Sequence, residues 1–368
     1  MKTNANTLRA MNDLKYKATN ICDRTVIGER NDGVWRGGAV EAEPLEPGTI
    51  LPLVIRPSSC RMDLIAWASE NREAIEANLY KHGGLLFRGF DALTASGFEA
   101  VIRAVSGELL EYRERSSPRS KVSNNVYTST DHPPDQSIFV HNENSYQQTF
   151  NLKIFFYCET PAQEGGETPI TDCRKILPLI DPPVLERFLQ KGWMYVRNYG
   201  DGFGLSWQTV FQTEDKGVVE NHCRKNGIQV EWKDGDRLRT RAVLPAVSRH
   251  PRTAEPIWFN HATFFHYTTL EPWIQEVMLE EFDNEEDFPT NTLYGDGTPI
   301  ERSALDRLRE IYRRHTVTFA WERGDVLMLD NMMVAHGRAP YSGDRRILVG
   351  MSEPTTRPEV AYSGQGSL

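Results

Sequence analysis

Three features that mark particular classes of protein are scarce or missing in this sequence of 368 residues. No run approaches the roughly 18 consecutive apolar residues of a membrane-spanning helix, and residues 1–17 lack the apolar stretch of a signal peptide. The five cysteines are odd in number and form no CxxC pair, which argues against a disulfide framework. We therefore expect a cytoplasmic protein without a membrane partner.

A surplus of basic residues is missing as well. The chain carries 42 Lys and Arg against 51 Asp and Glu, a formal net charge of −9. Nucleic-acid binders usually present a concentrated basic face, so we expect no nucleic-acid partner. The hydrophobic fraction of 39% and the charged fraction of 25% are ordinary for a globular protein with a large core.

What the sequence does contain is many short strand-like segments between a few helices. Residues 1–50 predict an irregular lead-in, and residues 51–368 predict a single catalytic domain with helical insertions. This pattern predicts a mainly β fold with flanking helices around a double-stranded β-helix, the jelly-roll or cupin-like core. The expected helices are 63–82, 95–105, 182–191, 270–282 and 304–313. The expected strands are 85–87, 151–158, 192–199, 229–232, 238–243, 317–321, 325–329 and 346–351.

A candidate metal site lies at His141-Asn142-Glu143, directly after an apolar strand. Side chains alternate along a strand, so His141 and Glu143 point the same way and can share one metal ion. About one His-x-acid triplet is expected by chance in this composition, so the triplet is weak by itself. A second histidine from a distant strand, His336, would complete the two-His-one-carboxylate triad of non-haem iron(II) oxygenases.

An arginine beyond the distal histidine suits a keto-acid co-substrate. Arg346 follows His336 by ten residues and begins an apolar strand. Its guanidinium can bind a carboxylate through two charge-assisted hydrogen bonds. The neighbouring Arg345 is expected to face the other way in a regular strand and to have a structural role.

Together with other motifs, these residues resemble the taurine dioxygenase (TauD/TfdA) family of Fe(II)/2-oxoglutarate-dependent oxygenases, and within it the SyrP-like branch. The motifs stand in family order from about residue 50 to the C-terminus, so the resemblance extends over most of the chain. They are Leu86-Phe87-Arg88-Gly89-Phe90, His141-Asn142-Glu143-Asn144-Ser145-Tyr146, Gly165-Gly166-Glu167-Thr168, Trp258-Phe259-Asn260, Tyr294-Gly295-Asp296-Gly297, Asp330-Asn331, His336-Gly337-Arg338 and Arg345-Arg346.

The resemblance implies a role for each matching residue. It implies that His141, Glu143 and His336 bind Fe(II), that Thr168 and Arg346 bind the C5 carboxylate of 2-oxoglutarate, and that O2 is the oxidant. The acidic ligand is Glu where taurine dioxygenase has Asp, as in the SyrP-like branch. Its presence disfavours halogenation, because related halogenases have a small residue there.

The implied activity is hydroxylation of an unactivated C–H bond in an amino acid or related small metabolite during natural-product biosynthesis, with release of succinate and CO2. The substrate is free or tethered to a carrier protein. Gly350, four residues after Arg346, disfavours a sulfonate substrate, because the family's sulfonate-binding arginine stands there. Desaturation, epoxidation or cyclisation remains an alternative outcome, and a non-catalytic jelly-roll binding protein is a remote one.

The residues after the metal triplet are candidates for the substrate pocket. They are Asn144, Ser145 and Tyr146. Trp207 is another, because it follows the Gly-rich segment 200–204, and such loops beside active sites often form lids. The sequence leaves open the substrate, the attacked carbon, the stereochemistry and the oligomeric state.

Overall fold

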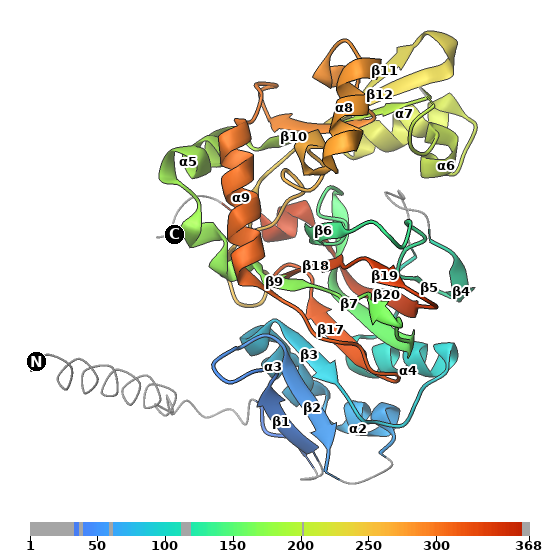
Figure 1. The fold of residues 1–368 in the computed structure, drawn as a ribbon, viewed down its shortest axis with the longest axis vertical. Helices are drawn as coiled ribbons and strands as arrows, with labels where there is room; N and C mark the ends of the chain where they lie inside the picture. Colours follow the sequence, from blue (N-terminus) through green and yellow to red (C-terminus); the bar gives the residue numbers. More distant parts are fainter. Residues whose placement is uncertain (1–32, 37–39, 59–61, 112–118, 201, 363–368) are drawn as a thin grey trace, which may run out of the picture.

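The computed structural model describes residues 33–36, 40–58, 62–111, 119–200 and 202–362 (Figure 1). Its centre is an eight-stranded sheet that faces a smaller, four-stranded sheet. In spatial order the large sheet contains β1 (Val40–Pro44), β2 (Leu53–Pro57), β3 (Gly84–Phe87), β17 (Val326–Asp330), β7 (Thr149–Thr160), β20 (Arg346–Thr356), β5 (Val126–Thr128) and β4 (Lys121–Ser123). The small sheet contains β16 (Thr316–Val317), β9 (Ile170–Asp172), β18 (Val334–Arg338) and β6 (Ile138–His141).

Strand β7 shows why these residues form a two-layered core. Phe156 and Cys158 belong to the core between the two sheets, whereas Phe155 and Tyr157 pack on the outer face of the large sheet. Both faces of the strand are therefore buried, which explains its nearly continuous apolar run in the sequence. The outer face is covered by α2 (Leu64–Glu70), α3 (Arg72–His82) and α4 (Ala95–Ser106) (Figure 1).

A second group of elements lies above the two sheets in Figure 1, and we call it the upper lobe. It has its own four-stranded sheet and a small core of its own. Its strands are β11 (Ile228–Lys233), β12 (Arg237–Leu244), β10 (Trp193–Tyr199) and β15 (Thr290–Tyr294), and its helices are α6 (Trp207–Phe211), α7 (Lys216–Lys225) and α8 (Pro272–Glu281). Helix α9 (Arg302–His315) connects the upper lobe to the small sheet.

The remaining elements are short and connect these units. The helix α5 (Pro182–Lys191) precedes β10. Two-stranded ribbons are formed by β13 (Val247–Arg249) with β14 (Pro256–Trp258) and by β19 (Tyr341–Ser342) with β8 (Glu164–Gly165). The 3-10 turns are η1 (Cys173–Lys175), η2 (Leu177–Leu179), η3 (Asp234–Asp236), η4 (Tyr267–Thr269), η5 (Glu285–Asp287) and η6 (Arg357–Val360).

The predicted mainly β fold with a jelly-roll core is confirmed, but three local predictions are wrong. Strand β1 lies inside the segment 1–50 that the sequence predicts to be irregular; its side chains are mostly exposed, so an apolar period is missing. The helix predicted over 63–82 breaks at Asn71, whose side chain donates to the Trp67 carbonyl. Residues 318–321 do not continue β16 as a strand. Residues 1–32 lie outside the described part of the chain.

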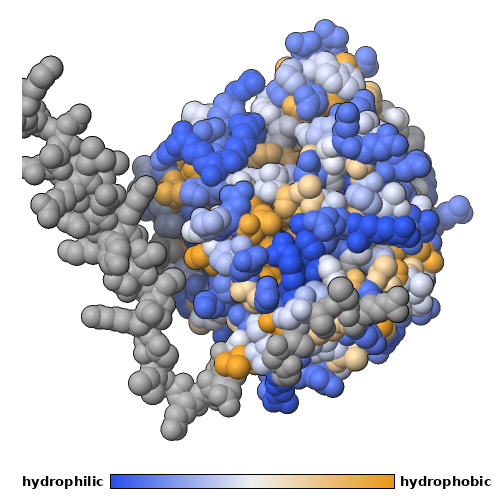
Figure 2. All heavy atoms as spheres, turned by 60° about the horizontal axis from the view of Figure 1, so that its bottom comes forward, coloured by the Kyte–Doolittle hydropathy of each residue, from blue (hydrophilic) through white to orange (hydrophobic). Residues whose placement is uncertain are grey.

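The outer surface is mainly polar on the face shown in Figure 2. Hydrophilic residues dominate this face, and apolar residues appear in small groups between them. Among the described residues, every helix is too short or too polar to cross a membrane.

Candidate metal centre

The register of the small sheet brings the two candidate histidines together. His141 is the last residue of β6, and His336 stands directly opposite it in the antiparallel neighbour β18. Their ring centroids are 4.8 Å apart. Possible ligand atoms of His141, Glu143 and His336 all lie within 4.8 Å of one another, so the three side chains could hold one metal ion between them. Elsewhere in the described ranges, no other group of three His, Cys, Asp or Glu side chains converges in this way.

The states of His141 and Glu143 suit a divalent cation. Nδ1 of His141 lies 2.9 Å from the Phe139 carbonyl oxygen, which only accepts, so Nδ1 carries the proton and Nε2 is left for a metal. Burial lowers the pKa of His141 to about 3, which keeps the ring neutral. Burial alone would raise the pKa of Glu143, but the Arg119 guanidinium and the nearby histidines hold it below its usual value.

Arg119 is a neighbour of the centre that the sequence analysis did not find. Its Nη2 lies 2.8 Å from Oε2 of Glu143, and the two side chains are 5% and 3% exposed. The same carboxylate oxygen lies 3.5 Å from Nε2 of His336. Arg119 therefore holds the carboxylate toward the histidine. No local pattern signals this role, because the contact joins positions 24 residues apart.

Asn331 fixes the backbone of the metal triplet. Its Oδ1 accepts from the Glu143 amide at 2.7 Å, and its Nδ2 donates to the carbonyls of Glu143 and Asn151, both at 2.8 Å. The preceding Asp330 accepts from the Met332 and Met333 amides, each at 3.0 Å. The turn between β17 and β18 is therefore tied to the backbone that carries Glu143.

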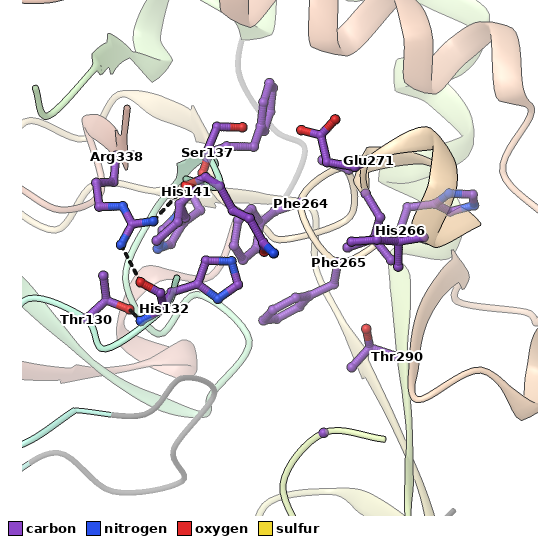
Figure 3. A pocket seen from close by; sticks show the side chains of 18 of the residues that line it. Thr130, His132, Ser137, His141, Phe264, Phe265, His266, Glu271, Thr290 and Arg338 are labelled. Atoms are coloured by element: carbon purple, nitrogen blue, oxygen red, sulfur yellow. Dashed lines mark hydrogen bonds between the residues drawn. The ribbon is translucent and has the colours of Figure 1, made fainter. Parts of the chain in front are cut away.

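The three candidate ligands line a cavity of about 830 Å³ between the sheets and the upper lobe. Figure 3 shows His141 beside Phe264, and the two rings stack with their centroids 4.3 Å apart; Phe265 is the next ring along the wall, 5.1 Å from Phe264. The guanidinium of Arg338 donates to the carbonyl oxygens of His132, Pro133 and Gln136 (Figure 3). These hydrogen bonds hold in place the loop that follows Thr130. The walls are therefore a mixture of aromatic rings and fixed polar groups.

The structure corrects the expected arginine. Arg346 is exposed, and its Nε lies 2.7 Å from Oε2 of Glu159, away from the cavity. Arg345 lines the cavity instead, where its Nε donates to the Gly166 carbonyl at 2.9 Å. The sequence predicts that Arg345 and Arg346 point to opposite sides of the strand, which is correct, but it assigns the wrong arginine to the inner side. Ile347 belongs to the core between the sheets, so Arg346 points outward and Arg345 inward.

Arg345 is a partly buried cation with an unusual environment. Within the described ranges, no carboxylate lies at ion-pair distance from it. Burial lowers its pKa to about 10, and the charge of Arg338 adds to this effect. Thr168 lines the same cavity, as the sequence analysis expects, and accepts a hydrogen bond from Nε1 of Trp321 at 3.1 Å. An anion with two carboxylates suits this environment.

The three residues after Glu143 do not line the cavity, contrary to expectation. The chain turns after Glu143 and takes a φ of 57° at Asn144, which directs these side chains into the protein. Asn144 donates to Asn151 at 3.2 Å, and Ser145 is hydrogen-bonded to His261. Tyr146 is buried in the core between the sheets.

Trp207 is also absent from the cavity wall. It packs edge-on against Trp232 in the core of the upper lobe, with ring centroids 5.3 Å apart. Its Nε1 donates to the Asp236 carbonyl at 3.1 Å. The Gly-rich loop before it does reach the cavity, through Phe203, Gly204 and Leu205. The cavity residues that the sequence analysis missed include Arg119, His132, Tyr195, Arg197, Phe264, Phe265 and Arg309.

Comparison with known proteins gives concordant results. The model of the taurine catabolism dioxygenase TauD, TfdA family matches residues 43–352. The dapdiamide synthesis protein DdaC of Enterobacter agglomerans is 40% identical over 280 residues, which cover 76% of this chain and 85% of that protein. The clavaminate synthase-like protein At3g21360 of Arabidopsis thaliana is 30% identical over 318 residues, which cover 82% of this chain and 93% of that protein.

Solved structures with low sequence identity share the fold. PvcB from Pseudomonas aeruginosa superposes with a TM-score of 0.50 at 16% identity, covering 88% of this chain and 94% of PvcB. A second structure, described as PvcB, an Fe, alpha-ketoglutarate dependent oxygenase from an isonitrile synthetic pathway, gives a TM-score of 0.51 at 15% identity. It covers 91% of this chain and 100% of the other. On the strength of the family match along most of its length, the chain belongs to the taurine catabolism dioxygenase TauD, TfdA family.

Proposed function

We propose that this oxygenase uses Fe(II), 2-oxoglutarate and O2 to hydroxylate an unactivated C–H bond of an amino acid or a related small metabolite, releasing succinate and CO2. One observation carries the proposal. Two histidines and one glutamate converge in a cavity that also contains a partly buried arginine without a carboxylate partner among the described residues. This is the donor set of a facial triad beside an anion site.

The proposed ligands are His141, Glu143 and His336. Bound there, iron would supply the oxygen activation that side chains cannot provide. The chain's own part is to hold the ligands. His141 is oriented by its bond to the Phe139 carbonyl, and Glu143 by Arg119 and Asn331. All three ligands come from the small sheet or the turn that follows β6, so the side toward the cavity remains open for co-substrate.

The proposed anchor of the co-substrate is Arg345, with Thr168 beside it in the wall. A guanidinium that is partly buried without a carboxylate partner is stabilised when it binds one. Thr168 has its hydroxyl fixed by Trp321, so it is positioned to donate to the same carboxylate. Ser129 lies 3.4 Å from Nη1 of Arg345 and helps to hold the guanidinium.

The proposed substrate class follows from relatives rather than from contacts. The relative at 40% identity is named for dapdiamide synthesis, which supports a place in natural-product biosynthesis. A carrier-bound amino acid is part of the same proposal. Glu143 occupies the position that a halide would need, which favours oxygen insertion over halogenation.

Anaerobic addition of Fe(II) and 2-oxoglutarate tests the proposal. We expect a visible charge-transfer band, and its absence would contradict the proposed cofactors. The variant Glu143→Ala should lose the band and all 2-oxoglutarate-dependent succinate formation. Glu159→Ala is the matched control, because Glu159 is a partly exposed acid outside the cavity wall. Succinate formation that survives in Glu143→Ala would refute the ligand assignment.

A further inference from the structure

We propose that the cavity accepts an extended substrate that carries an anionic group of its own, a carboxylate or a phosphate, rather than a free amino acid. The inference rests on the proposed function, because it takes Fe(II) and 2-oxoglutarate as the other occupants of the cavity. It goes beyond that function by naming the shape and charge of the substrate.

The size of the cavity is the first argument. Its volume of about 830 Å³ lies in the upper part of the roughly 300–1,000 Å³ range of pockets that enclose drug-sized ligands. Both 2-oxoglutarate and a free amino acid are much smaller than such ligands. Figure 3 shows His132 and His141 toward one end and His266 and Glu271 toward the other, with Phe264 and Phe265 between them. A longer molecule is needed to fill this space.

The charge of the lining is the second argument. Six arginines and no lysine line the cavity, against three carboxylates, in a chain whose overall charge is −9. The arginines are Arg119, Arg197, Arg309, Arg313, Arg338 and Arg345, and the carboxylates are Glu143, Glu271 and Asp306. Positive charge is therefore concentrated in the cavity against the sign of the whole chain. A cleft lined by one sign of charge raises the local concentration of oppositely charged ligands.

The cofactors do not remove this surplus. A divalent cation and a dicarboxylate cancel each other, so the excess of positive charge is the same with both bound. Oδ1 of Asp306 lies 2.7 Å from Nη2 of Arg309, so the carboxylate of Asp306 compensates the charge of Arg309. Arg338 and Arg345 each lie 5.3 Å from the ring centroid of Tyr341, and neither has a carboxylate at ion-pair distance among the described residues. The remote carboxylate of the co-substrate compensates only one of these two cations.

Helix α9 provides a test pair. Arg313 is exposed and lines the cavity, on the same face as Asp306 and Arg309. Arg314 is the next residue, but it does not line the cavity, and its Nε lies 2.6 Å from Glu310. Changing either residue to glutamine removes the same charge from the same helix. The change at Arg313 should alter the field inside the cavity far more, because Arg313 lines the cavity whereas Arg314 is paired with Glu310 outside it.

The experiment uses the full chain loaded with Fe(II) and 2-oxoglutarate under argon, titrated by calorimetry with probes matched in size. One arm compares N-succinyl with N-succinamoyl derivatives of the proteinogenic amino acids, which differ only in the terminal charge. The other arm compares acyl thioesters of 4′-phosphopantetheine and of pantetheine. The underivatised amino acids are titrated alongside. The arm that contains the tightest binder identifies the source of the anion as a carboxylate or a phosphate.

We expect the tightest anionic probe to bind at least about tenfold more tightly than its neutral partner and than the free amino acid, with a smaller advantage at high salt. Arg313→Gln should weaken the anionic probe about two- to fivefold and leave the neutral one unchanged. Arg314→Gln should change neither.

Equal affinities within each matched pair would overturn the inference, as would equal effects of the two arginine variants or tightest binding by a free amino acid. If the visible band of the Fe(II) and 2-oxoglutarate complex forms while the paired affinities are equal, the proposed function stands and this inference fails. If the band does not form, the proposed function fails and the inference falls with it.

Discussion

At the scale of single residues, Asn331 connects the two chain segments that carry the candidate ligands. Its side chain makes three hydrogen bonds of 2.7–2.8 Å to the backbone of Glu143 and Asn151. All of these groups are buried, so their loss is not repaired by water. Asn331 therefore holds the backbone of Glu143 in place, although its own side chain is not one of the proposed metal ligands.

Replacing Asn331 tests this support. We expect Asn331→Ala to lower the free energy of unfolding by about 2–4 kcal/mol, because buried backbone groups lose their partners. Fe(II) affinity should fall about 10- to 100-fold, as is typical when a residue that orients a ligand is removed. Urea denaturation and metal titration measure the two effects. Asn221→Ala on the exposed side of α7 is the control; wild-type metal affinity in Asn331→Ala would contradict the role.

The adjacent pair Arg345 and Arg346 gives a second prediction. Arg345→Gln should raise the KM for 2-oxoglutarate by about 100-fold, because a charge-assisted contact inside the cavity is lost. Arg346→Gln should leave the KM within about twofold, because its ion pair with Glu159 is partly exposed. Initial rates of succinate formation at varied 2-oxoglutarate decide between them. A large effect of Arg346→Gln alone would restore the assignment made from the sequence.

The phase of a strand explains why the sequence failed at this point. Adjacent arginines at a strand start are equivalent in sequence, and only the contacts of Ile347 on the inner face decide which arginine points inward. The convergence of His141, Glu143 and His336 was predictable from the His-x-Glu triplet and a distant histidine, although β6 ends at His141 and Glu143 lies in the turn that follows. The role of Arg119 was not predictable, because it depends on a contact with Glu143, a residue 24 positions away in the sequence.

At the scale of elements, the pairing of β18 with β6 is what joins the two histidines. Gly337 lies between the strands at their closest approach: a Cβ added there would lie 2.5 Å from the Ile138 carbonyl oxygen. Real Cβ atoms essentially never approach a backbone atom this closely. The glycine beside His336 is therefore required by strand packing, and a side chain there would force the strands apart.

This close approach predicts a specific defect. Gly337→Ala should destabilise the protein by about 2–4 kcal/mol, the range of a side chain forced into a packed core, and should weaken metal binding with it. Thermal unfolding and metal titration report both. The control is Gly97→Ala in α4, where a Cβ meets only ordinary contacts at 3.5 Å and alanine favours the helix. A variant at Gly337 with unchanged stability would show that the strands can separate at no cost.

The elements also show where reasoning from sequence was sufficient. The helices at 95–105, 182–191 and 304–313 were predicted close to their observed bounds, because an apolar face and a polar face alternate with the helical period. Strand β18 was expected only as the strand that carries His336, without bounds, because all five of its residues are buried and a histidine, a glycine and an arginine interrupt its apolar pattern. Asp234-Gly235 stands between the expected strands 229–232 and 238–243 and is a pair typical of a hairpin turn; Gly235 has the positive φ that such a turn needs, 69°.

At the scale of the whole molecule, buried histidines make stability depend on pH. Burial lowers the pKa of His266 to about 3, with a further contribution from Arg309. Burial also lowers the pKa of His261 well below its usual value. In the unfolded chain, a histidine has a pKa of about 6.5. Between these values the unfolded chain binds protons that the folded protein does not, so folding becomes less favourable as the pH falls.

The metal-free protein should therefore lose stability as the pH drops below about 6.5, and these histidines should contribute no slope above it. Each such histidine contributes up to about 1.4 kcal/mol per pH unit. His266→Gln should reduce the slope between pH 6.5 and 5 by up to that amount, as measured by urea denaturation at several pH values. An unchanged slope would show that His266 is protonated in the folded protein.

His336 and His141 lie opposite each other on neighbouring strands but are far apart in the sequence, which determines when they can meet during synthesis. The chain between them includes the whole upper lobe, so the pairing of β6 with β18 is a contact of very long sequence separation. Such contacts close late and slow folding, because a large loop must be ordered first. On the ribosome, His141 and Glu143 emerge long before their partner. The proposed metal centre can therefore be assembled only after nearly all of the chain has been translated, and prematurely terminated chains that end before β18 lack His336, the proposed third ligand.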